Sequence, residues 1–203
     1  MLTVSQKYFI DVIKSSVNDN FVRPDCPFES DIEWKQLHML VRRNKLDSLF
    51  YEELKNESFV PAWLLAEWKE RCCVEVLLDS RQQYEIERVA HQFKAAGIHF
   101  AFVKGCLLKA AYPNTHVRYM SDIDVIIMPE DRLRVHSCME SIGAAVSGYD
   151  GNDQNFEMPD GVHIETHGYM FFRKIKSGTA MYSDVRYFDR ENDRLTDEGY
   201  ALN

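Results

Sequence analysis

Residues 102–128 read FVKGCLLKAAYPNTHVRYMSDIDVIIM, and this stretch decides the fold. An apolar run over 99–103 predicts a buried strand. Gly105 is expected to turn the backbone into a short amphipathic helix over 106–112, which Pro113 ends. The stretch therefore predicts a strand, a glycine turn and a helix, followed by a polar loop and a second strand.

The second strand carries two aspartates, Asp122 and Asp124, within Ser-Asp-Ile-Asp over 121–124. Because side chains alternate along a strand, both carboxylates project to one face, while Ile123 and Val125 face the other side and can be buried. Two neighbouring carboxylates repel each other and are costly to desolvate unless a positive charge lies between them. A divalent cation that prefers oxygen ligands is the natural partner, which points to Mg²⁺, with Mn²⁺ as an alternative.

This order of features resembles the nucleotidyltransferase superfamily, which has the polymerase β-like fold. That pattern is a strand, a Gly-Gly or Gly-Ser turn, a helix and then Asp-x-Asp on the next strand. The stretch is more closely similar to an uncharacterised bacterial nucleotidyltransferase family that carries Leu-Lys-Gly, a Tyr, an Arg and Ser-Asp-Ile-Asp. The matching positions here are Val103-Lys104-Gly105, Tyr112, Arg118 and Ser121 to Asp124.

In this superfamily a third acidic residue arrives on a later strand, and Glu165 is the best-placed candidate. Glu-Thr-His at this position resembles the Glu-x-His of the family. The resemblance implies that Asp122, Asp124 and Glu165 bind metal and catalyse, with Glu165 accepting a proton from the attacking hydroxyl. His163 and His167 share the strand face of Glu165, and His167 could orient Glu165 or contact phosphate. The alternative is a solvated glutamate beside two structural histidines.

The implied reaction moves a nucleoside monophosphate from an NTP to a hydroxyl-type acceptor, and it depends on geometry and charge shielding. Gly105 would bring backbone N–H groups close to the phosphates. Lys104 and Arg118 are candidate phosphate cations, or else partners for nearby carboxylates. Cys106 departs from the usual Gly or Ser and donates only weakly, and Ser121 caps the loop or hydrogen-bonds to it. The candidate nucleotide-binding set is Lys104, Gly105, Cys106, Arg118 and Ser121.

Composition narrows the partners and the compartment. The 203 residues carry a formal net charge of −8, so a nucleic-acid acceptor is not expected, and a small molecule or a protein fits better. Five cysteines without a Cys-x-x-Cys motif predict reduced thiols rather than disulfides or a zinc site. The chain shows no signal-peptide pattern and no apolar run near about 18 residues, so we expect a cytoplasmic protein without a membrane span.

The whole chain predicts an α+β protein with a helical N-terminal region packed on a small mixed-sheet core. Ser30 and Glu33 form a capping box, and an uninterrupted helical pattern over 61–96 ends at Gly97. After Gly97, strands and helices alternate. The predicted parts are a helical region over 1–80, a nucleotidyltransferase-like core over 81–188, and over 189–203 the start of a C-terminal helical segment, truncated or completed in an oligomer.

Two other functions are compatible with the same residues. Cys106 in the turn would suit a non-catalytic module of this fold that binds a nucleotide or a protein partner. The carboxylates could instead direct water at a phosphate, as in a metal-dependent phosphohydrolase. Base preference, the acceptor and the oligomeric state, a homo-oligomer included, are not specified by the sequence.

Overall fold

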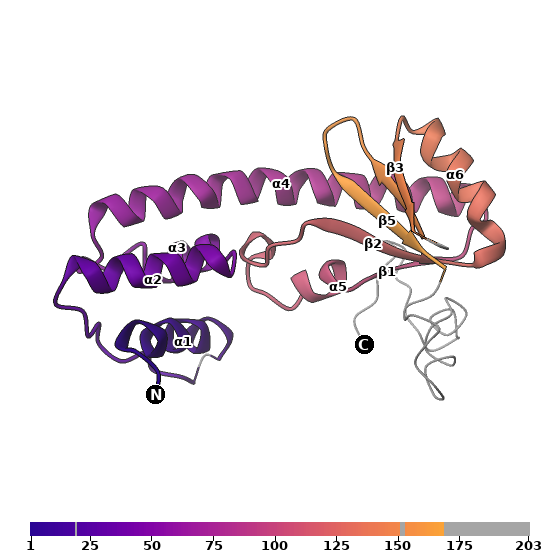
Figure 1. Ribbon diagram of the computed structural model, residues 1–203. Helices are drawn as coiled ribbons and strands as arrows, with labels where there is room; N and C mark the ends of the chain where they lie inside the picture. Colours follow the sequence, from indigo (N-terminus) through magenta and orange to yellow (C-terminus); the bar gives the residue numbers. More distant parts are fainter. Residues whose placement is uncertain (19, 151–152, 169–203) are drawn as a thin grey trace. The chain divides into compact units, whose positions relative to one another are not determined.

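The computed structural model describes residues 1–18, 20–150 and 153–168 (Figure 1). The helical segment predicted over 189–203 lies outside these residues. The chain forms two compact units, which are Met1–Leu77 with Tyr112–Tyr119, and Leu78–Ala111 with the described residues from Met120 onward. The segment Tyr112–Tyr119 therefore packs with the first unit, although it lies inside the 81–188 core predicted from the sequence.

The first unit is helical. It contains α1 (Val4–Val17), α2 (Asp31–Arg43), α3 (Asp47–Leu54), the first part of α4 (Ala62–Ala95) and the 3₁₀ turn η1 (Thr115–Val117). Apolar residues spaced three and four apart line one side of the helices, so their burial builds a common core. Members of this core without exposed surface include Val12, Leu37, Phe50, Leu64 and Trp68.

The helix ends confirm the capping signals in the sequence. At the start of α2, the Glu33 carboxylate accepts a hydrogen bond from the backbone N–H of Ser30 at 3.1 Å, which closes the predicted capping box. At the end of α4, Gly97 has a φ of +63°, and the N–H of Ile98 donates to the carbonyl of Phe93 at 2.9 Å. This left-handed glycine cap satisfies a carbonyl that a helix end leaves free. α4 is one continuous helix that ends just before Gly97.

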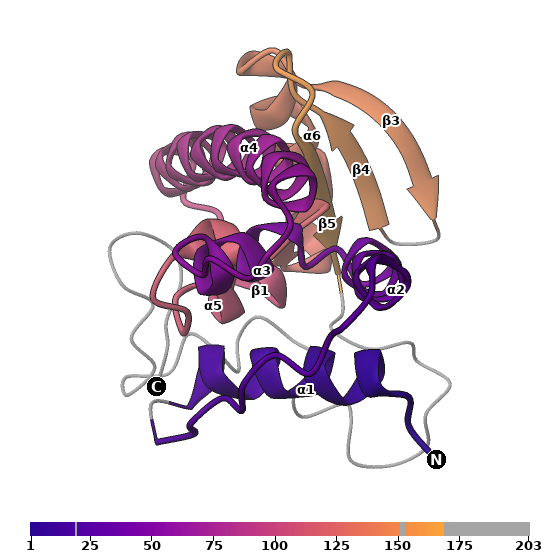
Figure 2. The ribbon, with the colours of Figure 1, turned by 90° about the vertical axis from the view of Figure 1, so that its left-hand side faces the viewer.

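The second unit is built on a five-stranded mixed sheet with the strand order β1-β2-β5-β4-β3. The strands are β1 (Phe100–Val103), β2 (Asp122–Ile127), β3 (Ala145–Asp150), β4 (Asp153–Glu157) and β5 (His163–His167). β2 and β5 are parallel, whereas the other neighbours are antiparallel. Figure 2 shows β3 and β4 side by side as a hairpin. The helical first unit and this sheet confirm the α+β class.

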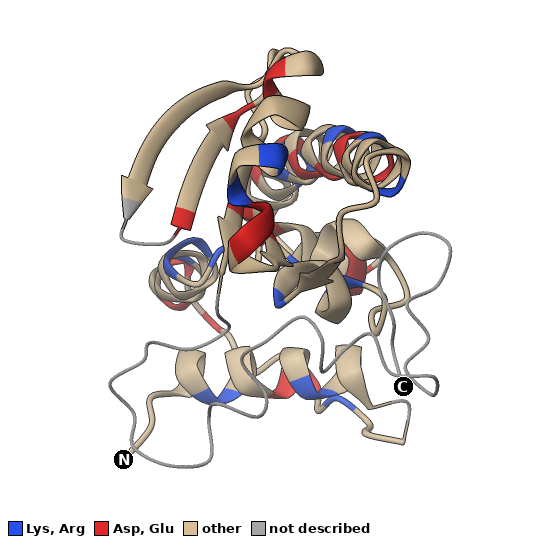
Figure 3. Ribbon diagram, turned by 90° about the vertical axis from the view of Figure 1, so that its right-hand side faces the viewer, with Lys and Arg blue, Asp and Glu red and all other residues tan. Residues whose placement is uncertain are grey.

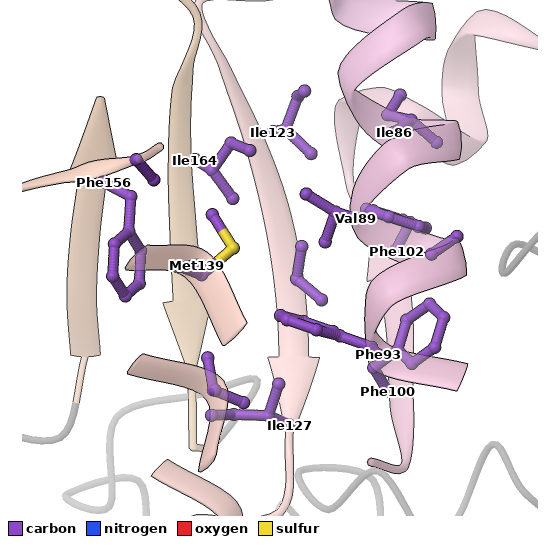
Figure 4. Close-up of a cluster of buried hydrophobic side chains, with 14 of the residues drawn as sticks. Ile86, Val89, Phe93, Phe100, Phe102, Ile123, Ile127, Met139, Phe156 and Ile164 are labelled. Carbon is purple, nitrogen blue, oxygen red and sulfur yellow. The ribbon is translucent and has the colours of Figure 1, made fainter. Parts of the chain in front are cut away.

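One face of the sheet is apolar and is covered by the second part of α4 and by α6 (Arg132–Ser141), which follows the turn η2 (Pro129–Asp131) (Figure 4). Side chains without exposed surface in this core include Val89, Phe93, Ile123, Val125, Met139, Phe156 and Ile164. Burying each stabilises the fold by about 1.5–3 kcal/mol. A one-residue slip of β2 would bury its aspartates instead, so the apolar face fixes which way they point.

Charge and thiol chemistry agree with the composition. Lys, Arg, Asp and Glu are interspersed along α4, so this helix offers no continuous basic face (Figure 3). All five cysteines lie in the described part of the chain and are free thiols, as predicted. Among the described residues, no helix combines the length and apolar character needed to cross a membrane.

Candidate active site

β2 places two aspartates on the sheet face opposite the helices. Ile123 and Val125 belong to the apolar core that the helices cover, whereas Asp122 is half-buried and the buried Asp124 contacts Lys104 and His167. The alternation predicted for this strand is confirmed. Both aspartates therefore belong to the same face of the sheet.

β5 brings Glu165 beside this pair. Parallel pairing sets Glu165 opposite Asp124 and His163 opposite Asp122. The structure thus gathers the three acidic residues singled out in the sequence. Burial, followed by repulsion from Asp122, raises the pKa of the Glu165 carboxyl. A carboxylate with a raised pKa is a stronger base than an ordinary surface glutamate, which suits it to accept a proton.

His167 lies among three carboxylates. Its Nε2 is 2.8 Å from Oδ1 of Asp124 and 3.7 Å from Oε2 of Glu165, and its Nδ1 is 3.1 Å from Oδ2 of Asp153. The hydrogen bond with Asp124 raises the pKa of His167, burial opposes it, and the bond with Asp153 reinforces it. Because 3.7 Å is too long for a hydrogen bond, His167 orients Asp124 rather than Glu165, which differs from the role expected for it.

Asp153 is a residue of this cluster that the sequence analysis missed. It begins β4, one position beyond the pair between Gln154 and Thr166, and so reaches His167 across the antiparallel strands. The polar, turn-rich stretch over 148–159 predicts a hairpin-like excursion, and this pattern singles out none of its acidic residues. The available signal was the alternation of Asp153, Asn155 and Glu157 around the buried Phe156, which is typical of a strand.

Lys104 joins β1 to α5 (Gly105–Lys109), and its Nζ contacts Oδ1 of Asp124. Burial by itself would raise the pKa of Asp124, but hydrogen bonds from His167 and Lys104 outweigh it and hold this pKa below its usual value. Lys104 has a φ of +53° and a ψ of −114°, a conformation that residues with a Cβ rarely adopt. We expected Gly105 to carry the unusual backbone of this turn. The strain instead falls on the lysine that contacts the acidic cluster, as is common at functional sites.

Gly105 and Cys106 face the protein interior. A Cβ on Gly105 would lie 2.7 Å from Sδ of Met120, so close packing accounts for the glycine. The Sγ of Cys106 is 3.8 Å from the same sulfur, and burial raises the pKa of its thiol to about 12. Of the groups of Cys106, the backbone N–H is therefore suited to contact a phosphate and the buried thiol is not.

The helix that begins at Gly105 is shorter than predicted. It ends at Lys109 rather than near Tyr112, because the N–H groups of Ala110 and Ala111 bond to carbonyls three residues back, at 3.3 and 3.1 Å. A helix of this length sums few peptide dipoles. The positive charge in the turn therefore comes mainly from Lys104.

The remaining candidate residues lie in two places. The Ser121 hydroxyl donates to Oδ1 of Asp122 at 2.8 Å, and His163 is exposed nearby. Both line a hollow of about 230 Å³ whose wall also includes Asp122, Ser147, Asn155 and Glu165. Small-molecule pockets are typically about 300–1,000 Å³, so this hollow is smaller than a typical one. Arg118 belongs to the first unit, where its Nη1 donates to the carbonyl of Tyr119 at 2.6 Å.

The acidic cluster has the donor set of a divalent-cation site. One ligand atom from each of Asp124, Glu165 and His167 lies within 4.8 Å of the other two. Carboxylate oxygens suit Mg²⁺ and Mn²⁺, and an imidazole nitrogen adds affinity for transition-metal ions. The expected metal ligands were Asp122, Asp124 and Glu165, and this cluster adds His167 to the last two. The Asp122 carboxylate accepts the hydrogen bond from Ser121 and stays a predicted ligand.

A family model described as "Uncharacterised nucleotidyltransferase" matches residues 30–201, a range that covers the first unit from residue 30 onward and the described part of the second unit. No curated protein and no solved structure matches the chain.

Proposed function

The chain belongs to the family of uncharacterised nucleotidyltransferases, and from this membership and its acidic cluster we propose a Mg²⁺-dependent transfer of a nucleoside monophosphate from an NTP to a hydroxyl-type acceptor. The observation that carries the proposal is the pairing of Asp124 with Glu165, with Lys104 and His167 both contacting Asp124. The net charge of −8 supports a small molecule or a protein as the acceptor.

The residues present fit a divalent cation. Asp124 and Glu165 would offer oxygens and His167 a nitrogen, while Asp122 stands on the same face to take part in a second site. A cation bound there would shield phosphate charge and activate the acceptor hydroxyl. Asp153 holds His167 through Nδ1, so Nε2, which bonds to Asp124 in this structure, is the nitrogen that would turn to the cation.

Glu165 is the group best suited to accept the proton of the acceptor. The acceptor oxygen forms a bond to the α-phosphorus, the bond from the α-phosphorus to the bridging oxygen breaks, and pyrophosphate leaves with that electron pair. The hydroxyl proton passes to the Glu165 carboxylate, whose raised pKa supports this role. Its side chain is 35% exposed, so the proton can then pass to water.

The turn after β1 supplies the proposed phosphate contacts. The Lys104 side chain is 55% exposed, so its ammonium can contact phosphate while remaining close to Asp124. The N–H groups of Gly105 and Cys106 begin α5 and can donate to the same phosphates. Ser121 completes the proposed nucleotide contacts of this unit. Arg118 of the first unit is a further proposed phosphate cation, since its guanidinium can bind bidentately.

We also propose that the strand, turn, helix and strand from β1 to β2 belong to a polymerase β-like core. The family match and the mixed sheet, with its acidic pair on β2 and Glu165 on the neighbouring β5, support this assignment. Under this proposal the described residues from β1 through β5 form the catalytic core.

The proposed transfer can be tested with the full-length chain and α-labelled ATP, GTP, CTP and UTP, with Mg²⁺ or Mn²⁺ and a panel of metabolite and cell-extract acceptors. We expect acceptor-dependent release of pyrophosphate together with transfer of the label, and loss of both with EDTA. Asp124→Asn should abolish the reaction. The matched control is Glu130→Gln, which removes an exposed carboxylate beyond the far end of β2.

The products distinguish the alternatives. Release of a free monophosphate or orthophosphate without an acceptor would identify a phosphohydrolase. Calorimetric binding of Mg²⁺-NTP without turnover would favour a non-catalytic nucleotide-binding module. If Asp124→Asn binds Mg²⁺-NTP as tightly as the native chain, the acidic cluster is not a metal–nucleotide site.

A further inference from the structure

A second cluster of potential metal ligands lies in the first unit, formed by Glu52 of α3, Cys72 of α4 and His116 of η1. One ligand atom from each lies within 4.8 Å of the other two. The proposed transfer uses none of these side chains. They come from three separate elements, so their convergence is a property of the tertiary packing of this unit.

The Nε2 atom of His116 is the informative atom of the cluster. It is shielded from solvent and has no hydrogen-bond partner, and Oε1 of Glu52 lies 3.8 Å away. A buried ring nitrogen without a partner is costly, and 3.8 Å is too long for a hydrogen bond. Two ligand bonds of about 2.0–2.1 Å that meet at a tetrahedral angle hold their ligand atoms about 3.3–3.4 Å apart. The separation of 3.8 Å is a few tenths of an ångström longer, so a small approach of the two side chains would let them share an ion.

We propose that Glu52, Cys72 and His116 bind a divalent cation of borderline softness, best represented by Zn²⁺. A thiolate sulfur, an imidazole nitrogen and a carboxylate oxygen are the ligand types of protein-bound zinc. The thiolate and the carboxylate together carry two negative charges, which one divalent cation neutralises. When the ion binds, the Cys72 thiol forms a metal–sulfur bond and releases its proton to solvent.

Surrounding residues fit this assignment. Nζ of Lys55 lies 2.6 Å from Oε2 of Glu52, which leaves Oε1 as the oxygen nearest His116. A hydrogen-bonded partner of this kind orients a ligating carboxylate. Cys72 is 5% exposed, while the side chains of His116 and Glu52 are 19% and 24% exposed. Water can therefore reach the fourth position that three protein ligands leave on a tetrahedral ion.

The site would join three elements of the first unit. An ion held by Glu52, Cys72 and His116 ties η1 to α3 and α4, and so fixes the segment Tyr112–Tyr119 within this unit. The same segment carries Arg118, two residues after His116. Binding of the ion by Glu52, Cys72 and His116 should therefore stabilise the first unit against unfolding, whether or not the acidic cluster of the second unit holds a cation.

Cobalt provides a direct test, because a bond from Co²⁺ to a thiolate gives a charge-transfer absorption band that carboxylates do not. We would titrate Co²⁺ into the reduced full-length chain carrying Asp124→Asn, which disables the acidic cluster, and then add Zn²⁺. We expect the band to appear and to disappear as Zn²⁺ displaces Co²⁺. Cys72→Ser should lose the band, whereas Cys73→Ser, which alters the exposed neighbouring thiol, should retain it.

Two further variants keep the test decisive if Cys72→Ser fails to fold. His116→Gln and Glu52→Gln keep the thiol, and each should lose the increase in Tm that Zn²⁺ produces in the parent chain. Circular dichroism would confirm that each variant is folded. The proposal is wrong if the parent chain shows no cobalt–thiolate band, or if the Zn²⁺ effect on Tm survives His116→Gln unchanged.

Discussion

The two ligand clusters of this protein are built in different ways. In the second unit, Asp124 and Glu165 become neighbours because two parallel strands pair in register. In the first unit, Cys72 and His116 meet because helices and a returning turn pack together. Paired strands place their polar side chains next to one another on one face of the sheet, so several carboxylates become neighbours there. Packed helices instead bring together single residues of different chemical types. The chemistry of each cluster thus follows from the way its backbone was assembled.

The clusters also differ in charge. Around the acidic cluster, Lys104 and His167 already contact Asp124, and Asp122 and Asp153 add further negative charge. This excess of negative charge favours the binding of exchangeable divalent cations, which suits phosphoryl transfer. The proposed site in the first unit would be balanced by one divalent ion, which suits a stabilising role. The comparison predicts that the two sites respond to different metals and to different substitutions.

The largest expected effect is a separation of the two sites by mutation. Asp124→Asn should lower nucleotidyl transfer by about 10²–10³-fold or more, because it removes a proposed ligand of the cation that shields the reacting phosphate, yet it should leave the cobalt–thiolate band intact. Cys72→Ser should remove the band and leave transfer by the folded protein largely unchanged. Activity assays and cobalt spectra on both variants check this. A loss of both signals in either folded variant would show that the sites are coupled.

Asp153→Asn should weaken metal affinity or transfer by about 10–100-fold, because Asp153 holds His167, which in turn orients Asp124. The pKa of His167 should also fall, since the bond with Asp153 helps to raise it. An NMR titration of the His167 ring would detect this change. An unchanged ring titration together with full activity would mean that Asp153 does not position the cluster.

Gly105→Ala should destabilise the second unit by about 1–3 kcal/mol, because the new Cβ would lie 2.7 Å from Sδ of Met120. Met120→Ala removes that sulfur, so the same glycine substitution should cost less in its background. A double-mutant cycle from urea unfolding measures the difference. Equal costs in the two backgrounds would show that Met120 does not explain the glycine.

Each unit also contains one lysine with a positive φ, Lys45 at +54° and Lys104 at +53°. At both positions the Gly variant should be more stable than the Ala variant by about 1–2 kcal/mol, because both lose the side chain but only glycine relieves the strain. Thermal unfolding of the four variants tests this. Lys104→Gly should still lower transfer, since the contact with Asp124 is lost. If Gly and Ala variants are equally stable, the backbone there is not strained.

The smallest expected effect concerns Glu165 and pH. Because its pKa is raised in the folded protein, the stability that Glu165 contributes is full below the pKa of an unfolded glutamate and is lost as pH rises through the raised value. Without metal, Glu165→Gln should therefore be slightly more stable than the native chain at neutral pH, and the difference should shrink in acid. Exposure of the side chain keeps the effect small. The Tm of the native chain and of Glu165→Gln, measured against pH in EDTA, tests this prediction. A variant less stable than the native chain at neutral pH would contradict it.

Local patterns in the sequence were sufficient to predict the helices and strands and the face of the sheet to which the two aspartates project. The period of two in β2 sets Ile123 and Val125 against Asp122 and Asp124, and burial of the apolar pair determines the face. Capping residues such as Ser30 and Gly97 act within a few positions of themselves, so the helix ends that they mark were also predictable. The family resemblance then pointed to Glu165, which periodicity could only place on a polar face.

Tertiary structure alone decided which of these polar residues meet. Asp153 reaches His167 only because β4 pairs with β5, and His116 reaches Cys72 only because a distant segment returns to the first unit. The strain on Lys104 likewise depends on a turn fitted between Met120 and Asp124. Contacts between residues far apart in the chain depend on how whole elements pack, and a periodic pattern sets the face a side chain occupies without naming its neighbour there.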